Sequence, residues 1–322
     1  MENKDKNILQ YKVGGLLYMP AFKKNIVEKI KNNSISCLNS VAFCLEDSIQ
    51  DMALAAAEDT LKNILRELNF VYEKSSNKDL PLIFIRPRSP EHLRRIHEKF
   101  SDSVAIITGY ILLKFDLRNA EKFCAVIREI NCYVMPTFES EQVADISART
   151  ANLIALKKIL DGVKERVLNI RVGVNDFSNL YNLRRNVNCT VYDVGVVRDI
   201  LIDILNVFAK DYVVAGSVWN YFGKEKGGWS EGLTRELTLD KINGFIGKSA
   251  IHPSQLPYIF ESLKVSQADL NDAEQILNWD SDSLGVVKGS GRMNELKCHS
   301  NWAKKIKILS EIYGVKNDKS LV

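Results

Sequence analysis

Two acidic residues at the ends of apolar segments are the most chemically suggestive feature of the sequence. Glu139 ends segment 133–139 (YVMPTFE), and Asp176 ends segment 168–176 (LNIRVGVND). An α/β enzyme places metal ligands and general bases at the carboxyl ends of its buried strands. Two strand-end carboxylates can converge on one divalent cation. The pair Glu139 and Asp176 is therefore the predicted metal site.

Polar side chains also stand at the ends of other apolar segments. In chain order these are Glu46 and Asp47, Arg86, Lys114, Trp219 or Asn220, and His252. The set contains no Ser–His–Asp arrangement and no cysteine beside a histidine, so nucleophilic catalysis is not indicated. Capping of the following helix is an alternative role for the acidic residues. We expect His252 to be structural and Lys114 to pair with an acid nearby.

Apolar segments alternate with helical patterns along most of the chain. The predicted strands are 16–20, 41–46, 80–87, part of 104–115, 133–139, 168–176, 212–218 and 248–253. Eight strand-then-helix units in roughly 260 residues are typical of a (β/α)8 TIM barrel. A doubly wound open sheet is the alternative, but residues 19–22 (MPAF) after the first strand lack a glycine-rich phosphate loop.

The chain is expected to form two parts. Residues 1–265 are the predicted TIM-barrel catalytic domain, and 266–322 are the predicted C-terminal helical extension or lid. In that extension we expect helices at 267–279 and 296–313, separated by a loop at 280–293 that is rich in Gly and Ser. The long insertion 177–193 carries Arg184 and Arg185, which we expect to offer positive charge to a phosphate or carboxylate group.

Composition narrows the class of protein. The 322 residues are 46% hydrophobic and 26% charged, with a net charge of +4. Such a small and dispersed charge does not predict a nucleic-acid surface, and no apolar run predicts a signal peptide or membrane span. The six cysteines lack CxxC spacing, so a structural zinc is not indicated. We expect reduced thiols and a cytoplasmic location.

Six short motifs in order resemble one family. They are LEDS at 45–48, IR at 85–86, ES at 139–140, GVND at 173–176, IHPSQ at 251–255 and GRMNE at 291–295. The sequence resembles the citrate lyase β-subunit-like group, within the superfamily of HpcH/HpaI-type aldolases and malyl-coenzyme A lyases. The resemblance extends over about residues 13–313. It implies a TIM barrel with a C-terminal helical lid.

The resemblance also implies roles for individual residues. Glu139 and Asp176 match the metal ligands of the family, and Mg²⁺, with Mn²⁺ as the alternative ion, suits such oxygen ligands. Arg86 matches an arginine that binds a substrate carboxylate or a developing enolate oxygen. Glu46 and Asp47 would hold metal-bound water or assist proton transfer.

Two further roles follow from the same resemblance. Backbone N–H groups at Gly173 and Asn175 would bind the substrate carboxylate. Glu295 matches an acid of the lid that acts as a base and is supplied by a neighbouring subunit. A homo-oligomer, trimeric or hexameric, is therefore expected.

The sequence departs from the family pattern at three places. Residues 20–24 (PAFKK) replace a stretch with glycine and arginine that is associated with the thioester carrier. Cys44 stands where the first acid of the LEDS-type motif is expected, and Glu295 stands where an aspartate is usual. The first departure leaves open whether a coenzyme A or acyl-carrier thioester is used.

The sequence thus predicts a Mg²⁺-dependent carbon–carbon bond lyase. It would act by aldol- or Claisen-type cleavage or condensation on a 2-oxo or 2-hydroxy acid or its thioester. Two alternatives are a condensing enzyme of the malate synthase type and a non-catalytic ligand-binding barrel that has lost the thioester site. The predicted partner is a small carboxylate, not a nucleic acid or a membrane.

Overall fold

The computed structural model of the chain describes residues 6–23, 25–74, 80–130, 132–279 and 285–316. It divides into two compact units, Met1–Ile259 and Phe260–Val322. Among the described helices, none combines the length and the apolar character needed to cross a membrane.

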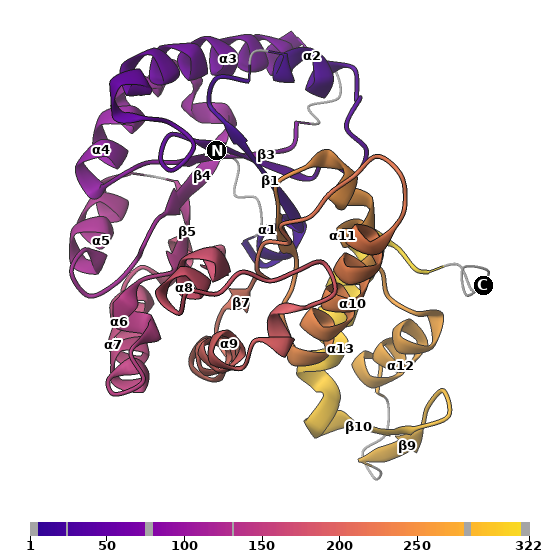
Figure 1. Cartoon of the computed structure of the whole chain (residues 1–322). Coiled ribbons are helices and arrows are strands. Elements are labelled where there is room, and N and C mark those ends of the chain that lie inside the picture. The colour runs from indigo at the N-terminus through magenta and orange to yellow at the C-terminus, as the bar shows by residue number, and fades with distance from the viewer. Residues whose placement is uncertain (1–5, 24, 75–79, 131, 280–284, 317–322) are drawn as a thin grey trace. The chain divides into compact units, whose positions relative to one another are not determined.

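Eight parallel strands form the centre of the first unit (Figure 1). They are β1 (Gly15–Pro20), β2 (Ser40–Cys44), β3 (Leu82–Arg86), β4 (Ile107–Leu112), β5 (Tyr133–Phe138), β6 (Asn169–Val172), β7 (Val213–Val214) and β8 (Lys248–Ala250). Neighbouring strands follow one another in the chain, and β1 also pairs with β8. A parallel bridge between Gly216 and Lys248 closes the ring. The predicted TIM barrel is therefore confirmed.

The first helix precedes β1, and the other helices follow strands around the barrel. They are α1 (Lys6–Lys12), α2 (Ile26–Lys31), α3 (Leu54–Lys74), α4 (Pro90–Lys99), α5 (Ala120–Glu129), α6 (Glu141–Ala144), α7 (Arg149–Asp161), α8 (Val174–Leu180), α9 (Gly195–Phe208), α10 (Gly228–Asn243) and α11 (Leu256–Leu263). Local sequence explains several boundaries. Ser89 caps α4 by accepting a hydrogen bond from His92 N at 3.1 Å, and Pro90 occupies the first helical position.

Strand register determines which side chains face the interior of the barrel. Parallel partners share a face, and the pairs Tyr18–Ala42 and Thr137–Arg171 both point inward. The inner core is apolar at the amino ends of the strands, where its members are Leu16, Ala42, Leu82, Phe84, Ile111, Tyr133, Met135 and Leu168. Leu9 and Val13, in α1 and just after it, complete this cluster. The carboxyl ends of the strands are left to polar side chains.

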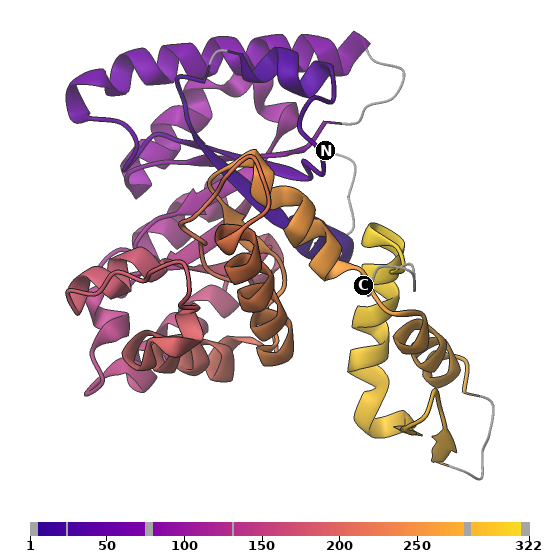
Figure 2. The ribbon, with the colours of Figure 1, turned by 45° about the vertical axis from the view of Figure 1, so that its right-hand side comes forward.

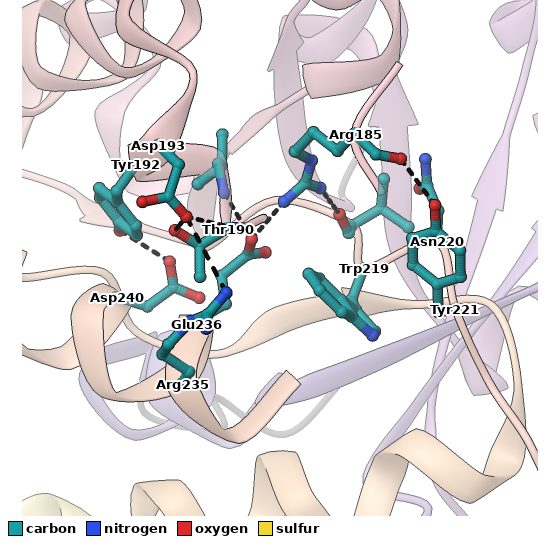
Figure 3. A network of polar contacts seen from close by, with 12 residues as sticks. Arg185, Thr190, Tyr192, Asp193, Trp219, Asn220, Tyr221, Arg235, Glu236 and Asp240 are labelled. Atoms are coloured by element: carbon teal, nitrogen blue, oxygen red, sulfur yellow. Dashed lines mark hydrogen bonds and ion pairs between the residues drawn. The ribbon is translucent and has the colours of Figure 1, made fainter. Parts of the chain in front are cut away.

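The outward face of β8 is held by a buried ionic network. The Lys248 ammonium lies 2.8 Å from Glu236 Oε1 and 2.7 Å from Asp240 Oδ2, both on α10. Tyr192 donates to Asp240, and Arg185 pairs with the other oxygen of Glu236 (Figure 3). Each buried charge therefore has an opposite charge beside it, which is the condition for burying such groups.

The second unit contains two helices and a small hairpin. Helices α12 (Gln267–Leu277) and α13 (Leu296–Tyr313) pack together, and β9 (Val286–Lys288) pairs antiparallel with β10 (Met293–Glu295) (Figure 2). The prediction of a loop over 280–293 was therefore wrong at residues 286–288 and 293, which belong to strands. Gly291, with φ of 81°, supplies the left-handed residue that the hairpin turn requires. Residues 280–284 lie outside the described residues.

Two local features near the site also need explanation. Residues 141–161 form two helices, α6 and α7, because the Asp145 side chain accepts hydrogen bonds from the N–H and hydroxyl of Ser147 and forms a turn between them. The second feature is the end of a strand that was predicted over 168–176. Strand β6 ends at Val172, and α8 begins at Val174. Asp176 therefore lies in the first turn of a helix, not at the end of a strand.

Candidate active site

A cavity of about 360 Å³ lies at the carboxyl ends of the barrel strands. In a TIM barrel this is the end that carries catalytic residues. Six of the predicted site residues line it: Asp47, Arg86, Glu139, Gly173, Asn175 and Asp176. The predicted residues that are far apart in the sequence are thus brought together here.

Arg86, the last residue of β3, lies among three acidic side chains. Its Nη1 donates to Asp47 Oδ2 at 3.0 Å, and its Nη2 donates to Glu139 Oε1 at 3.0 Å. The same Nη2 lies 3.2 Å from Glu46 Oε2. These contacts fix the guanidinium plane at the wall of the cavity.

Glu139 follows β5 and is buried. Its Oε1 accepts hydrogen bonds from Arg86 and from the backbone N–H of Lys114 at 3.0 Å. Its Oε2 accepts no hydrogen bond from the described residues. Burial raises the pKa of Glu139, the Arg86 guanidinium lowers it, and the nearby charge of Asp176 raises it again, with a net rise. One carboxylate oxygen is thus left for a ligand.

Gly173 makes room for that carboxylate. A Cβ at position 173 would lie 2.2 Å from Glu139 Oε2 and 2.4 Å from Glu139 Cβ. No other residue type can occupy this position without displacing Glu139. Gly173 therefore positions the predicted metal ligand, a role that the sequence prediction did not include.

Asp176 reaches the cavity from the first turn of α8. Its Oδ1 lies 3.9 Å from the ammonium of Lys114, as expected for Lys114 as the partner of an acid. Burial raises the pKa of Asp176, Lys114 lowers it, and the charge of Asp47 raises it, with a net rise. Lys114 adopts a left-handed backbone conformation with φ of 41°, which is uncommon outside glycine and frequent at functional sites.

Glu46 and Asp47 are neighbouring acids whose pKa values shift in opposite directions. Burial and a hydrogen bond to Asp47 raise the pKa of Glu46 to about 7, against the opposing effect of Arg86. Although burial acts to raise it, the hydrogen bond from Glu46 and the charge of Arg86 lower the pKa of Asp47. Of the two carboxyl groups, Glu46 therefore binds a proton more readily than Asp47 does.

Asn175 lines the cavity and is exposed to solvent. Its Oδ1 accepts a hydrogen bond from Asn220 Nδ2 at 2.9 Å. This bond connects the start of α8 to the loop after β7. Asn220 thereby steadies the backbone that was predicted to bind a substrate carboxylate.

Three other residues considered in the sequence are Arg185, His252 and Glu295. Arg185 is buried, pairs with Glu236 and donates to Val218 O at 2.9 Å, so the prediction that it offers charge to a substrate was wrong (Figure 3). His252 caps the short turn that follows it and stacks on Phe222, as expected for a structural residue. Glu295 belongs to the second unit, at the junction of β10 and α13, and its catalytic role stays a prediction.

Sequence reasoning missed Arg171 on β6, which also lines the cavity. It is 1% exposed and donates to Ser249 Oγ on β8 at 2.7 Å. The sequence pattern that indicates Arg171 is the alternation of Asn169, Arg171 and Gly173. It places three non-apolar residues on one face of an otherwise apolar strand.

The donor set at the cavity fits a magnesium ion. Glu139 and Asp176 present oxygen atoms, which are the ligands that Mg²⁺ prefers. The pKa of each carboxyl group is raised in part by a neighbouring negative charge, as expected where a cation would be favourable. No group of three or more His, Cys, Asp or Glu side chains forms a metal cluster within the described residues. Mg²⁺ commonly binds through one or two carboxylates, with water and substrate completing its coordination.

Solved structures share this fold. CitE from Mycobacterium tuberculosis, in complex with magnesium, acetoacetate and coenzyme A, is 17% identical, with a TM-score of 0.59 over 94% of this chain and 99% of that one. A citrate lyase from Burkholderia xenovorans LB400 is 14% identical, with a TM-score of 0.69 over 95% and 94%. RipC from Yersinia pestis is 12% identical, with a TM-score of 0.56 over 81% and 99%. These likenesses show the fold that the motifs led us to expect.

No functionally curated protein matches the sequence. The sequence model of the C–C bond lyases of the TIM-barrel fold, in contrast, matches residues 7–315. This match includes every strand of the barrel and both helices of the second unit. The chain therefore belongs to the family of C–C bond lyases of the TIM-barrel fold.

Proposed function

We propose that the protein is a Mg²⁺-dependent lyase that cleaves or forms a carbon–carbon bond of a 2-oxo or 2-hydroxy acid, or of its thioester. The observation that carries the proposal is the convergence of Arg86, Glu139 and Asp176 on one cavity at the carboxyl end of the barrel. The cavity is lined by a guanidinium and two carboxylates, which supports a site for a metal ion and a small acid.

Glu139 and Asp176 would hold the metal, Glu139 through its unpaired Oε2. When bound, Mg²⁺ supplies a Lewis acid that polarises the oxygen of a 2-oxo or 2-hydroxy group. Support for this ion comes from the structural neighbours. A citrate lyase β subunit from M. tuberculosis was solved with oxaloacetate and magnesium, and CitE with magnesium and acetoacetate.

The remaining residues have separate roles in the proposal. Arg86 stabilises the negative charge that develops on an enolate oxygen, because its guanidinium is already fixed at the cavity wall. Asp47 and Glu46 exchange a proton with the substrate hydroxyl, and the pKa of about 7 at Glu46 is well matched to this step. The backbone N–H groups at Gly173 and Asn175 bind the substrate carboxylate.

Two finer features belong to the same proposal. Glu295 is a second candidate for the base. Its supply by a neighbouring subunit would require a homo-oligomer, which we propose to be a trimer or hexamer. We propose a cytoplasmic location for the enzyme. Whether the acid is used as a coenzyme A thioester is decided by turnover with and without the acyl-coenzyme A. Absence of the glycine and arginine at 20–24 favours the free acid.

Calorimetric titration of Mg²⁺ in the presence of 2-oxobutyrate tests the proposal. The wild-type protein is expected to bind the ion, and Glu139→Gln and Asp176→Asn are expected to weaken binding by at least tenfold. Asp199→Asn, an exposed acid on α9, is the matched control and should bind as the wild type does. Equal Mg²⁺ binding by the wild type and the Glu139→Gln/Asp176→Asn double variant would refute the metal site.

A further inference from the structure

Arg171 is a buried cation without an acidic partner. Its side chain donates to Ser249 Oγ at 2.7 Å and to Asn169 Oδ1 at 3.4 Å, and its Cζ lies 6.0 Å from the centre of the Tyr18 ring. No carboxylate of the described residues forms an ion pair with it. The other buried arginines differ in this respect, since each pairs with a carboxylate: Arg86, Arg149 and Arg185.

An uncompensated buried charge is costly. Moving a guanidinium out of water is unfavourable unless an opposite charge accompanies it. Burial accordingly lowers the pKa of Arg171. Proteins retain such a charge where a ligand supplies the missing partner, because the free energy lost in the empty site is regained on binding.

Further unpaired polar atoms lie on the same inner face. Thr137 is the register partner of Arg171 on β5, and its Oγ1 has no hydrogen-bond partner in the described part of the chain. The same holds for Arg171 Nε and for Ser217 Oγ. Ser217 follows Gly216, which pairs with outward-facing Lys248, so Ser217 faces inward with Ser249. The inner wall therefore offers one charge and several hydrogen-bonding groups.

The same cavity connects this wall with the proposed metal site. Arg171, Thr137 and Ser249 line it together with Glu139 and Asp176. Thr137 lies in β5, two residues before Glu139, which corresponds to roughly 7 Å between their Cα atoms in an extended chain. An acid of four or five carbons, contacted by a side chain at each end, can span a backbone spacing of this size.

We infer that Arg171, Ser249 and Thr137 form a carboxylate-binding subsite inside the barrel, and that the substrate is a dicarboxylic 2-oxo or 2-hydroxy acid of four or five carbons. The inference rests on the proposed function, which places the other end of the acid at Glu139 and Asp176. A carboxylate fits better than a phosphate dianion because the cavity is lined by two cations, and Arg86 already faces three acidic groups.

A pair of ligands of equal length tests the subsite. 2-Oxoglutarate and 2-oxopentanoate differ only in the carboxylate at the far end. In the presence of Mg²⁺, the wild-type protein is expected to bind 2-oxoglutarate roughly 10- to 100-fold more tightly, the range expected of hydrogen bonds to a charged group. Arg171→Met should reduce this ratio to about one and leave the affinity for 2-oxopentanoate unchanged. Ser249→Ala should reduce the ratio by a smaller factor.

Thermal unfolding without ligand separates binding from a structural role. Arg171→Met removes an uncompensated charge, so its melting temperature should equal or exceed that of the wild type. Arg185→Met is the matched control, because Arg185 is also buried but pairs with Glu236, and its removal should lower the melting temperature. A fall for Arg171→Met as large as that for Arg185→Met would overturn the inference.

The two proposals fail in different ways. If both acids require Mg²⁺ but Arg171→Met keeps the wild-type ratio, or if neither acid binds, the subsite is refuted. If 2-oxoglutarate binding depends on Arg171 but is the same with and without Mg²⁺, the subsite stands and the metal-dependent function falls. Should Arg171→Met fail to fold, the ratio of the affinities for 2-oxoglutarate and 2-oxopentanoate is measured in Arg171→Lys and Ser249→Ala instead. A wild-type ratio in both variants overturns the inference.

Discussion

Gly173 lies against the carboxylate of Glu139 so closely that a Cβ at position 173 would stand 2.2 Å from Glu139 Oε2. This contact joins the end of β6 to the end of β5 at the proposed metal site. Because both neighbours of the missing Cβ belong to Glu139, any substitution must move that side chain. Glycine is thus required at position 173 if the Glu139 side chain is to keep its position.

Gly173→Ala should therefore weaken Mg²⁺ binding by at least tenfold, as removal of the Glu139 carboxylate does. Calorimetry measures the affinity, and circular dichroism establishes that the barrel has folded. Gly195→Ala is the control, since the nearest atom to a Cβ there, on the flexible Arg198 side chain, is 4.0 Å away. Normal Mg²⁺ affinity in Gly173→Ala would show that Glu139 is free to move or does not bind the ion.

Replacement of Arg86 should destabilise the protein in a pH-dependent way. Arg86→Met leaves Glu46, Asp47 and Glu139 without their common counter-charge, at a cost of about 3–5 kcal/mol near pH 8. The loss should shrink towards pH 5, because the unpaired carboxyl groups then bind protons in the folded state. Urea unfolding at both pH values measures it, and a loss that does not vary with pH would contradict this account.

Glu46 gives the protein a distinct pH dependence of stability. Its pKa rises from 4.5 to about 7 on folding, so the folded protein binds a proton that the unfolded chain releases between these values. This contribution to stability is complete below pH 4.5 and is lost as the pH rises through 7, with a slope of at most about 1.4 kcal/mol per pH unit.

Glu46→Gln should remove that part of the decline. Comparison of urea unfolding for the variant and the wild type from pH 5 to pH 8 isolates the contribution of this one group. The two curves should converge towards low pH if the amide reproduces the hydrogen bond of the protonated acid. Parallel curves across the whole range would mean that the pKa of Glu46 is not raised.

The buried network behind β8 should show strong coupling between its members. Lys248→Met leaves Asp240 buried without a cation, at a cost of about 3–5 kcal/mol, whereas Glu236 keeps its contact with Arg185. Adding Asp240→Asn should recover part of this loss, because the unpaired charge is then gone. A double-mutant cycle from urea unfolding measures the coupling, and simple additivity of the two losses would argue against it.

Sequence patterns were sufficient to predict the barrel and to name six of the residues that line the cavity. Continuous apolar strands bounded by polar residues mark a parallel sheet with both faces covered, and strand ends in a barrel converge by topology. Arg86 and Glu139 could therefore be named as neighbours although β4 separates their strands. Asp176 lines the cavity as expected but was assigned to the wrong element, because the short helix α8 starts immediately after Gly173.

Contacts between distant segments could not be predicted in the same way. Arg185 and Glu236 are 51 residues apart, and nothing in the local pattern of either indicates the other. Arg185 consequently resembled a free cation in a basic loop. The hairpin of the second unit was missed because β9 and β10 contribute only three residues each, too few for an alternating pattern.

The hydrogen bond between Arg171 and Ser249 connects β6 to β8 across β7, which contributes only Val213 and Val214 to the sheet. With so few backbone bonds at this point, the ring is more easily opened here than between its longer strands. A ligand held by Arg171 and Ser249 therefore acts also as a cross-link between the two strands. Amide hydrogen exchange on either side of β7 should accordingly slow when the barrel is filled, so that occupancy of the interior and the rigidity of the barrel wall rise together.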